Sequence, residues 1–303
     1  MPRSYAKPRA GSARIAASCL VLFVATVAIA SGTPKYFPAK KLHLAKKQNA
    51  TKDRRNHMIA ADYTEDVRSD GEAVTVLLNG WPIADMQGGQ DAGLINYAVI
   101  DGTNHLSVTI ASPPSGKSGS ADTATVLIQN GPELILSLKW KASATPPQPL
   151  PLHKAATFQS GTHFGPRVWQ TTAPVTLDEA TKEAIRAQVH RFRDLLEAKD
   201  LNGVVQMFAA RDHEDAISHG EAPEQNTAAA REDYQQMLAD PHWRMAPIQD
   251  DRLQFHLIVD KRVVLVDYGK DTHVLTTLPA PNGDVTAFDL YLSHVNGQWE
   301  IVQ

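Results

Sequence analysis

The chain has 303 residues, of which 43% are hydrophobic and 21% are charged. These ordinary globular values argue against a disordered or fibrous chain, and the length predicts more than one folded unit. Charge is divided unevenly, because 12 of the 30 lysines and arginines but only one of the 33 acidic residues precede residue 61. The acidic remainder argues against nucleic-acid binding, which needs clustered positive charge on a folded surface.

The N-terminus combines a basic segment with an apolar one. Residues 15–30 read IAASCLVLFVATVAIA, and four basic residues precede them. This order is typical of a signal peptide, and the run is shorter than the roughly 20 apolar residues of a spanning helix. Ala28-Ile29-Ala30 fits a signal-peptidase site. We therefore expect residues 1–30 to be a signal peptide or membrane anchor, and the protein to be periplasmic or otherwise extracytoplasmic, secreted or anchored by its N-terminus.

The single cysteine, Cys19, lies inside this apolar segment. The rest of the chain therefore has no thiol for a disulfide, for thiolate catalysis or for zinc binding. His213 and His219 are six residues apart, whereas the zincin motif places two histidines four residues apart on one helical face. We interpret residues 213–219 as the polar end of a surface helix, and the sequence predicts no metal site and no cofactor.

A basic stretch follows the apolar segment. Residues 31–61 contain eight lysines and arginines and few large apolar side chains. Such a composition cannot bury enough apolar surface to fold alone, which predicts a disordered tether. The tether is either a solvated spacer or a segment attracted to an anionic membrane surface. Membrane contact is expected through residues 15–30 in either case.

The next part of the chain alternates apolar and polar residues in three stretches, 73–83, 96–112 and 121–140. A period of two is typical of half-buried strands. Four pairs that favour tight turns flank these stretches: Asp70-Gly71, Asn79-Gly80, Asp101-Gly102 and Asn130-Gly131. We therefore predict an antiparallel β-sandwich over residues 62–172.

Two segments rich in proline, glycine and serine interrupt this region. Residues 113–120 predict an exposed loop, and residues 145–151 predict a stiff connection. Beyond them, residues 156–160 and 167–172 have the composition of further strands, which either return to the sandwich or cover the following unit.

Large aromatic residues lie along the predicted sandwich: Trp81, Tyr97, Trp140 and Trp169. Aromatic faces stack on sugars, although packing in a core is the commoner role of such residues. Trp81 stands between a glycine and a proline at a turn, so it is the one that we expect at the surface. In the spacing of its predicted strands and turns alone, the region resembles accessory β domains that present a loop or face to a sugar, a peptide or a partner.

Residues 173–303 predict helices followed by strands. Thr176 and Glu179 form a capping-box pattern, so a helix should begin there. Its apolar residues recur at helical spacing: Ile185, Val189, Phe192 and Leu196. Asp200 should cap a second helix, and residues 227–239 should form a third.

Strand-like stretches fill the chain after Asp251, and Asn282-Gly283 and Asn296-Gly297 mark two of their turns. Helices followed by antiparallel strands define an α+β unit whose curved sheet wraps the long first helix. The expected fold class is thus two-domain: an N-terminal antiparallel β-sandwich, followed by an α+β cone-like domain of three helices and a curved antiparallel sheet.

Two stretches of this second unit resemble the nuclear transport factor 2-like (SnoaL-like) superfamily. AIRAQVHRFRDLLEAKDLNGVVQMF, residues 184–208, looks like the superfamily's opening helices, and LYLSHVNGQWEIVQ, residues 290–303, is similar to its closing hairpin. The resemblance implies a conical pocket between helices and sheet. Some members use this pocket for acid–base chemistry on small hydrophobic substrates, and others use it for binding or dimerisation.

Enzymes of that superfamily place a carboxylate, or a carboxylate and a histidine, in the pocket. The candidate catalytic residues here are Asp267 with His256 or His273, which lie on predicted strands. Proton transfer requires such a group to be within reach of the substrate, with its pKa moved toward neutrality by burial. The alternative is that these side chains face solvent or pair structurally. The candidate ligand-binding residues are Trp81, Asp289 and Tyr291.

Three functions stay open on the sequence. The first is a non-enzymatic envelope binding or assembly protein with a protein or small-molecule partner, and the lack of a complete catalytic motif favours it. The second is a SnoaL-like isomerase or hydrolase acting in the C-terminal pocket. The third is an immunity or inhibitor protein whose acidic surface captures a basic, envelope-targeted toxin.

Overall fold

The computed structural model describes residues 62–112, 123–141, 150–269 and 272–303. These residues belong to one compact unit. The predicted signal or anchor segment, the basic tether, the loop at 113–120 and most of the connection at 145–151 lie outside the described residues. Within the described ranges, no helix combines the length and the apolar character that crossing a membrane requires.

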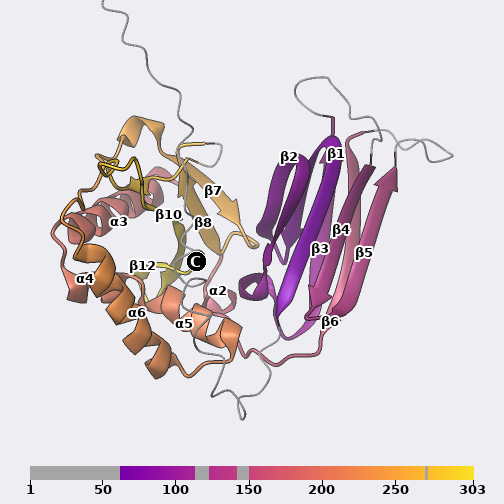
Figure 1. The fold of residues 1–303 in the computed structure, drawn as a ribbon, viewed down its shortest axis with the longest axis horizontal. Coiled ribbons are helices and arrows are strands. Elements are labelled where there is room, and N and C mark those ends of the chain that lie inside the picture. The colour runs from indigo at the N-terminus through magenta and orange to yellow at the C-terminus, as the bar shows by residue number, and fades with distance from the viewer. Residues whose placement is uncertain (1–61, 113–122, 142–149, 270–271) are drawn as a thin grey trace, which may run out of the picture. The chain divides into compact units, whose positions relative to one another are not determined.

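Six antiparallel strands, β1 to β6, form one sheet (Figure 1). They span Tyr63–Leu78, Trp81–Leu94, Gly102–Ala111, Thr123–Asn130, Glu133–Lys141 and Leu152–Ser160. The order is β5-β4-β1-β3-β6, with β2 paired to β1. The end strands approach each other, since Lys154 Nζ donates to Lys139 O at 2.9 Å. The prediction of an antiparallel β-rich first part is confirmed.

The long strand β1 organises the sheet because it pairs with three others. Residues 63–69 pair with β4, residues 73–78 pair with β3, and β2 follows both halves. The register shifts between the halves, where Gly71 has a φ of +105°. Asp70-Gly71 is therefore a bulge inside a continuous strand and not the predicted turn, because a bulge bends a strand without ending it. The six strands therefore form one sheet, whereas the predicted sandwich has two.

The inner face of this sheet forms the first hydrophobic core. Alternate residues of β1 and β3 are buried, as the period of two predicted: Val74, Val76, Leu78, Leu106, Val108 and Ile110. Three valines from the far end of the chain join the same core: Val259, Val263 and Val302. The sheet therefore completes its core with residues that follow the end of its last strand, Ser160, by 99 positions or more (259 − 160 = 99).

Residues 167–172, predicted as a strand, instead contain the short helix α2, Val168–Thr171. Tertiary contacts decide its conformation. Arg167 N donates to the side-chain oxygen of Gln170 at 2.9 Å, which closes the first turn. Such a contact is invisible to a strand pattern that counts only β-branched and aromatic residues.

Four longer helices follow: α3 (Glu179–Glu197), α4 (Leu201–Met207), α5 (Ala209–His219) and α6 (Pro223–Leu238). The predicted capping box at Thr176 is wrong, because Asp178 caps α3 by accepting from Thr181 N at 2.8 Å. The predicted cap of α4 is confirmed, since Asp200 accepts from Gly203 N at 3.1 Å. Helix α6 begins at Pro223, four residues before the predicted start. Residues 213–219 belong to α5, which the sequence did not predict as a separate helix.

The remaining strands form two small antiparallel sheets, one ordered β12-β11-β8-β7 and one made of β9 and β10 (Figure 1). Strands β7 to β12 span Gln254–Ile258, Val263–Asp267, Leu275–Thr276, Ala287–Phe288, Tyr291–Val295 and Gln298–Ile301. The apolar residues predicted for the first helix are all buried in a second core between the helices and these strands. Aromatic rings fill much of that core: Phe192, Phe208, Tyr234, Trp243 and Phe288.

The turn between β7 and β8 has a strained backbone. Val259, Asp260 and Lys261 have φ angles of +50°, +51° and +65°, a region that a β-branched residue rarely adopts. Contacts hold the turn in place, because Val175 N donates to Lys261 O at 2.7 Å. The turn packs against Gly80, where an added Cβ would lie 2.8 Å from Val259 Cα.

The contact between these two turns predicts the effect of Gly80→Ala. The left-handed φ of +84° should cost an alanine about 1–2 kcal/mol, and the clash with Val259 should add about 1–3 kcal/mol. Gly283→Ala is the matched control, because Gly283 has the same φ of +84° and nothing within 4 Å of the added atom. Urea denaturation should show the larger loss for Gly80→Ala, and equal losses would contradict the close packing of the two turns.

Candidate functional site

The structure pairs each predicted catalytic histidine with a different carboxylate. His256 Nε2 lies 3.3 Å from Asp267 Oδ1, and His273 Nδ1 lies 3.0 Å from Asp289 Oδ1. Both pairs reach solvent, since 46% of the His256 side chain and 50% of the Asp289 side chain are exposed. Asp267 also accepts from Gly269 N at 2.7 Å. Water therefore reaches both pairs, and a catalytic role stays a prediction.

The aromatic residues lie elsewhere than expected. Trp81 is only 1% exposed, so the expectation that it reaches the surface is wrong. Its ring lies 5.8 Å from Tyr97, 5.9 Å from Trp169 and 5.3 Å from Tyr291, between centroids. The reason is that Asn79 and Gly80 make the turn, so Trp81 is already the first inward-facing residue of β2. Burial also raises the pKa of the Tyr97 hydroxyl well above its usual range.

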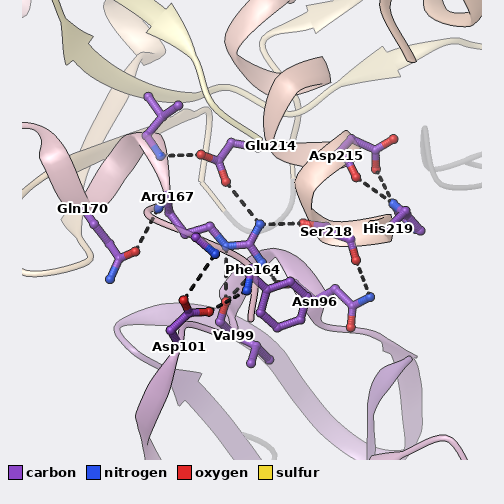
Figure 2. A network of polar contacts seen from close by, with 12 residues as sticks. Asn96, Val99, Asp101, Phe164, Arg167, Gln170, Glu214, Asp215, Ser218 and His219 are labelled. Atoms are coloured by element: carbon purple, nitrogen blue, oxygen red, sulfur yellow. Dashed lines mark hydrogen bonds and ion pairs between the residues drawn. The ribbon is translucent and has the colours of Figure 1, made fainter. Parts of the chain in front are cut away.

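Among the described residues, the most completely buried charge is Arg167, whose side chain has 0% exposure. Figure 2 shows the polar contacts around it. Its guanidinium donates to Asn96 O at 2.6 Å and to Val99 O at 3.2 Å, both on the sheet side. Toward α5 it donates to Ser218 Oγ at 3.0 Å and lies 3.5 Å from Glu214 Oε2. One side chain thus joins the end of the sheet to a helix more than 40 residues later.

Further contacts complete this network. Asn96 Nδ2 donates to Ser218 O at 2.8 Å, so sheet and helix also meet directly. Asp101 accepts from Phe164 N at 2.5 Å and fixes the segment leading into α2. The Phe164 ring lies 4.7 Å from the Arg167 guanidinium carbon, close enough for a cation–π contact.

Glu214 is the charge partner of Arg167 and also holds α2. Its Oε1 accepts from Val168 N, at the first residue of the helix. Burial raises the pKa of Glu214, and this outweighs the opposing effects of the Val168 N–H and of Arg167. Burial likewise lowers the pKa of Arg167, although a guanidinium stays charged in proteins.

Sequence reasoning missed both members of this pair. Arg167 lies in a segment predicted as strand, and Glu214 lies in one predicted as a solvated helix end. The available signal was the spacing of Ala210, Glu214 and Ser218, which are four residues apart and therefore share one helical face. All three are buried in the structure. A glutamate on a buried face requires a partner, but the sequence does not say which cation supplies it.

A pocket of about 790 Å³ opens on the outward face of the six-stranded sheet. Strand register arranges its floor in two cross-strand rows. Leu77, Ser107 and Ala155 form one row. The second row contains His105 opposite Thr157, with Asn79 bonded to His105. The walls are Trp169 and Gln170 of α2 and the strained turn with Val259, Asp260 and Arg262.

The buried network positions one of these walls. Helix α2 is held at its start by Glu214, which accepts from Val168 N. At its end, Arg262 Nη1 donates to Gln170 O at 3.1 Å and to Thr172 O. The wall that carries Trp169 is therefore fixed from both ends before any ligand arrives.

The pocket presents hydrogen-bonding and charged groups around a floor that consists mostly of small side chains. Its volume falls in the range of about 300–1,000 Å³ that is typical of small-molecule sites. Ser107 and Thr157 supply hydroxyls, His105 an imidazole, and Asp260 and Arg262 opposite charges. A second hollow, between α3, α4 and β12, has only about 60 Å³. The larger pocket therefore lies on the sheet, whereas the sequence placed one inside the C-terminal unit.

Compared with protein-family models, curated proteins and solved structures, the chain shows no match. Within the described ranges, no group of three or more His, Cys, Asp and Glu side chains is arranged to hold a metal ion.

The buried ion pair predicts a large loss of stability for Arg167→Ala. Removing the guanidinium leaves Glu214 buried without its opposite charge and deprives two carbonyls, Asn96 O and Val99 O, of their donor. The loss should cost about 3–5 kcal/mol. Arg186→Ala is the control, because its pair with Glu183 is exposed (28% and 70%) and should contribute at most about 1 kcal/mol. Similar losses in urea denaturation would contradict the structural role of Arg167.

The raised pKa of Glu214 predicts a pH dependence. Between the ordinary value of 4.5 and the raised value, the folded state binds this proton more tightly than the unfolded state does. The contribution of Glu214 to stability should therefore fall as the pH rises through that window. Glu214→Gln lacks the titration, so the unfolding free energy of the wild type minus that of the variant should decrease as the pH rises above 4.5. If this difference instead rises with pH, the charge of Arg167 lowers the pKa of Glu214 by more than burial raises it.

Proposed function

We propose that this chain is a non-enzymatic binding protein of the cell envelope, and that the 790 Å³ pocket on the sheet is its ligand site. One observation carries the proposal: the pocket has the size of a small-molecule site, and a buried ion-pair network fixes its wall. A wall that is ordered in advance lowers the entropy cost of binding, because fewer side chains must be immobilised.

The groups in the pocket favour binding over acid–base chemistry. The predicted catalytic residues Asp267, His256 and His273 are not among the residues that line it. Ser107 and His105 both face the pocket from β3, and no hydrogen bond between their side chains joins a nucleophile to a base among the described residues. The available hydroxyls, imidazole and charges are instead spaced across the floor and walls, where they can contact different parts of one ligand.

The proposed envelope location is supported by the apolar segment at residues 15–30 and the basic residues before it. The proposed likeness of residues 173–303 to the nuclear transport factor 2-like superfamily has two supports. Helix α3 leads into α4 through the cap at Asp200, and β11 and β12 form a closing hairpin with Trp299 on its last strand. In this proposal, that unit packs its interior with side chains, and binding takes place on the sheet.

Filling the pocket predicts a loss of binding. Ser107→Trp places an indole over the floor from an exposed position of β3, so the core should stay intact. Thr109→Trp is the matched control, because it lies two residues further on the same face and does not line the pocket. A fragment library of neutral and charged molecules, screened by ligand-observed NMR, should bind the wild type and Thr109→Trp, and should lose most hits with Ser107→Trp.

Circular dichroism and thermal unfolding establish that both variants are folded. The proposal is overturned if the wild type binds no fragment, or if Ser107→Trp retains the same hits as Thr109→Trp.

A further inference from the structure

Arg262 is a cation of the pocket wall whose hydrogen-bonding capacity is only partly used. Its Nη1 donates to Gln170 O at 3.1 Å and to Thr172 O, the carbonyls at the end of α2. A guanidinium has five N–H donors, so Nε and Nη2 keep three that bond to no described residue. The charge is thus fixed in position with one edge of the guanidinium unused.

Arg262 has no carboxylate partner, as is also true of Arg191, Arg231 and Arg252 among the ten arginines that the structure describes. Six arginines have one within 4.0 Å: Arg68, Arg167, Arg186, Arg193, Arg211 and Arg244. Arg262 contacts only carbonyl oxygens among the described residues, and it is half-buried at the pocket. A half-buried cation without a counter-charge attracts an anion more strongly than an exposed one does, because solvent screens it less.

Asp260 limits what this anion can be. It lies two residues away on the same strained turn and also lines the pocket. Its carboxylate repels a second negative charge and accepts from a donor group such as an amide N–H. The pocket therefore favours a ligand with a single negative charge and a nearby hydrogen-bond donor over a multiply charged anion.

We propose that the ligand carries a carboxylate and that the unused edge of Arg262 binds it. This inference rests on the proposed function of the pocket. A guanidinium and a carboxylate match in a planar, two-point hydrogen bond, and α2 already orders the Arg262 side chain. The rest of the ligand lies over the small floor, where Ser107 and Thr157 supply hydroxyls. The same chemistry is found in the C-terminus of a peptide and in a small organic acid.

Matched acids and amides test the inference and separate the two sources. The probes are N-acetyl-alanyl-alanine and N-benzoylglycine, each as the free acid and as its primary amide. Calorimetric titration of the wild type should show each bound acid at least about tenfold tighter than its amide, because a hydrogen bond between charged groups is stronger than one to a neutral group. Binding of the peptide acid alone identifies a peptide C-terminus, binding of the benzoyl acid alone identifies a small organic acid, and either result supports Arg262 as the anchor.

Two variants at the β7–β8 turn separate the electrostatic effect on the ligand from the structural effect on α2. Arg262→Gln should abolish the preference for acids, and circular dichroism with thermal unfolding reports whether the variant stays folded. Asp260→Asn leaves the bonds to α2 intact and keeps an acceptor oxygen for the N–H of the ligand, and it should tighten binding of the acids about two- to fivefold relative to the amides. This second variant keeps the test valid if Arg262→Gln disturbs the wall.

Two results overturn the inference in distinguishable ways. If acids and amides bind the wild type equally, and Ser107→Trp blocks both, the pocket binds ligands but Arg262 does not select a carboxylate. If no probe and no fragment binds, the proposed function fails together with the inference.

Discussion

The ion pair between Arg167 and Glu214 is the interaction on which the arrangement of this protein depends. Two opposite charges are buried where water cannot solvate them, so each is tolerated only while the other stays in place. Because one lies before α2 and the other on α5, their contact fixes the sheet, the short helix and the long helices together. The pocket wall follows from this constraint, since α2 has too few residues to hold its own position.

Local signals predicted the elements that local physics determines. The alternation of Leu106, Val108 and Ile110 identified β3, because a half-buried strand exposes every second residue. Asp200 identified the start of α4, because a cap acts within one turn. The same reasoning failed at Asp70-Gly71, which has the composition of a turn. Pairing with β2 and β4 continues the strand through it as a bulge, and no local pattern encodes that pairing.

The candidate site was much less predictable than the strands. Its floor consists of ordinary strand residues such as Ser107 and Ala155, which become a floor only because register brings them into one row. Its walls come from α2 and from the β7–β8 turn, far away in the sequence. Trp81, the aromatic expected at the surface, is covered by Trp169 of α2 and Tyr291 of β11. Composition identified reactive residue types, but distant contacts decide which of them share a cavity.

The first core contains Val259, Val263 and Val302 beside the strands of the N-terminal sheet. During synthesis, the sheet leaves the ribosome well before these valines exist, and its apolar face lacks part of its cover until they arrive. A nascent or prematurely terminated chain therefore exposes apolar surface that the complete protein buries, and chaperones would bind this surface. For the same reason, the six strands expressed without residues 259–302 would be expected to aggregate, however complete their hydrogen bonding.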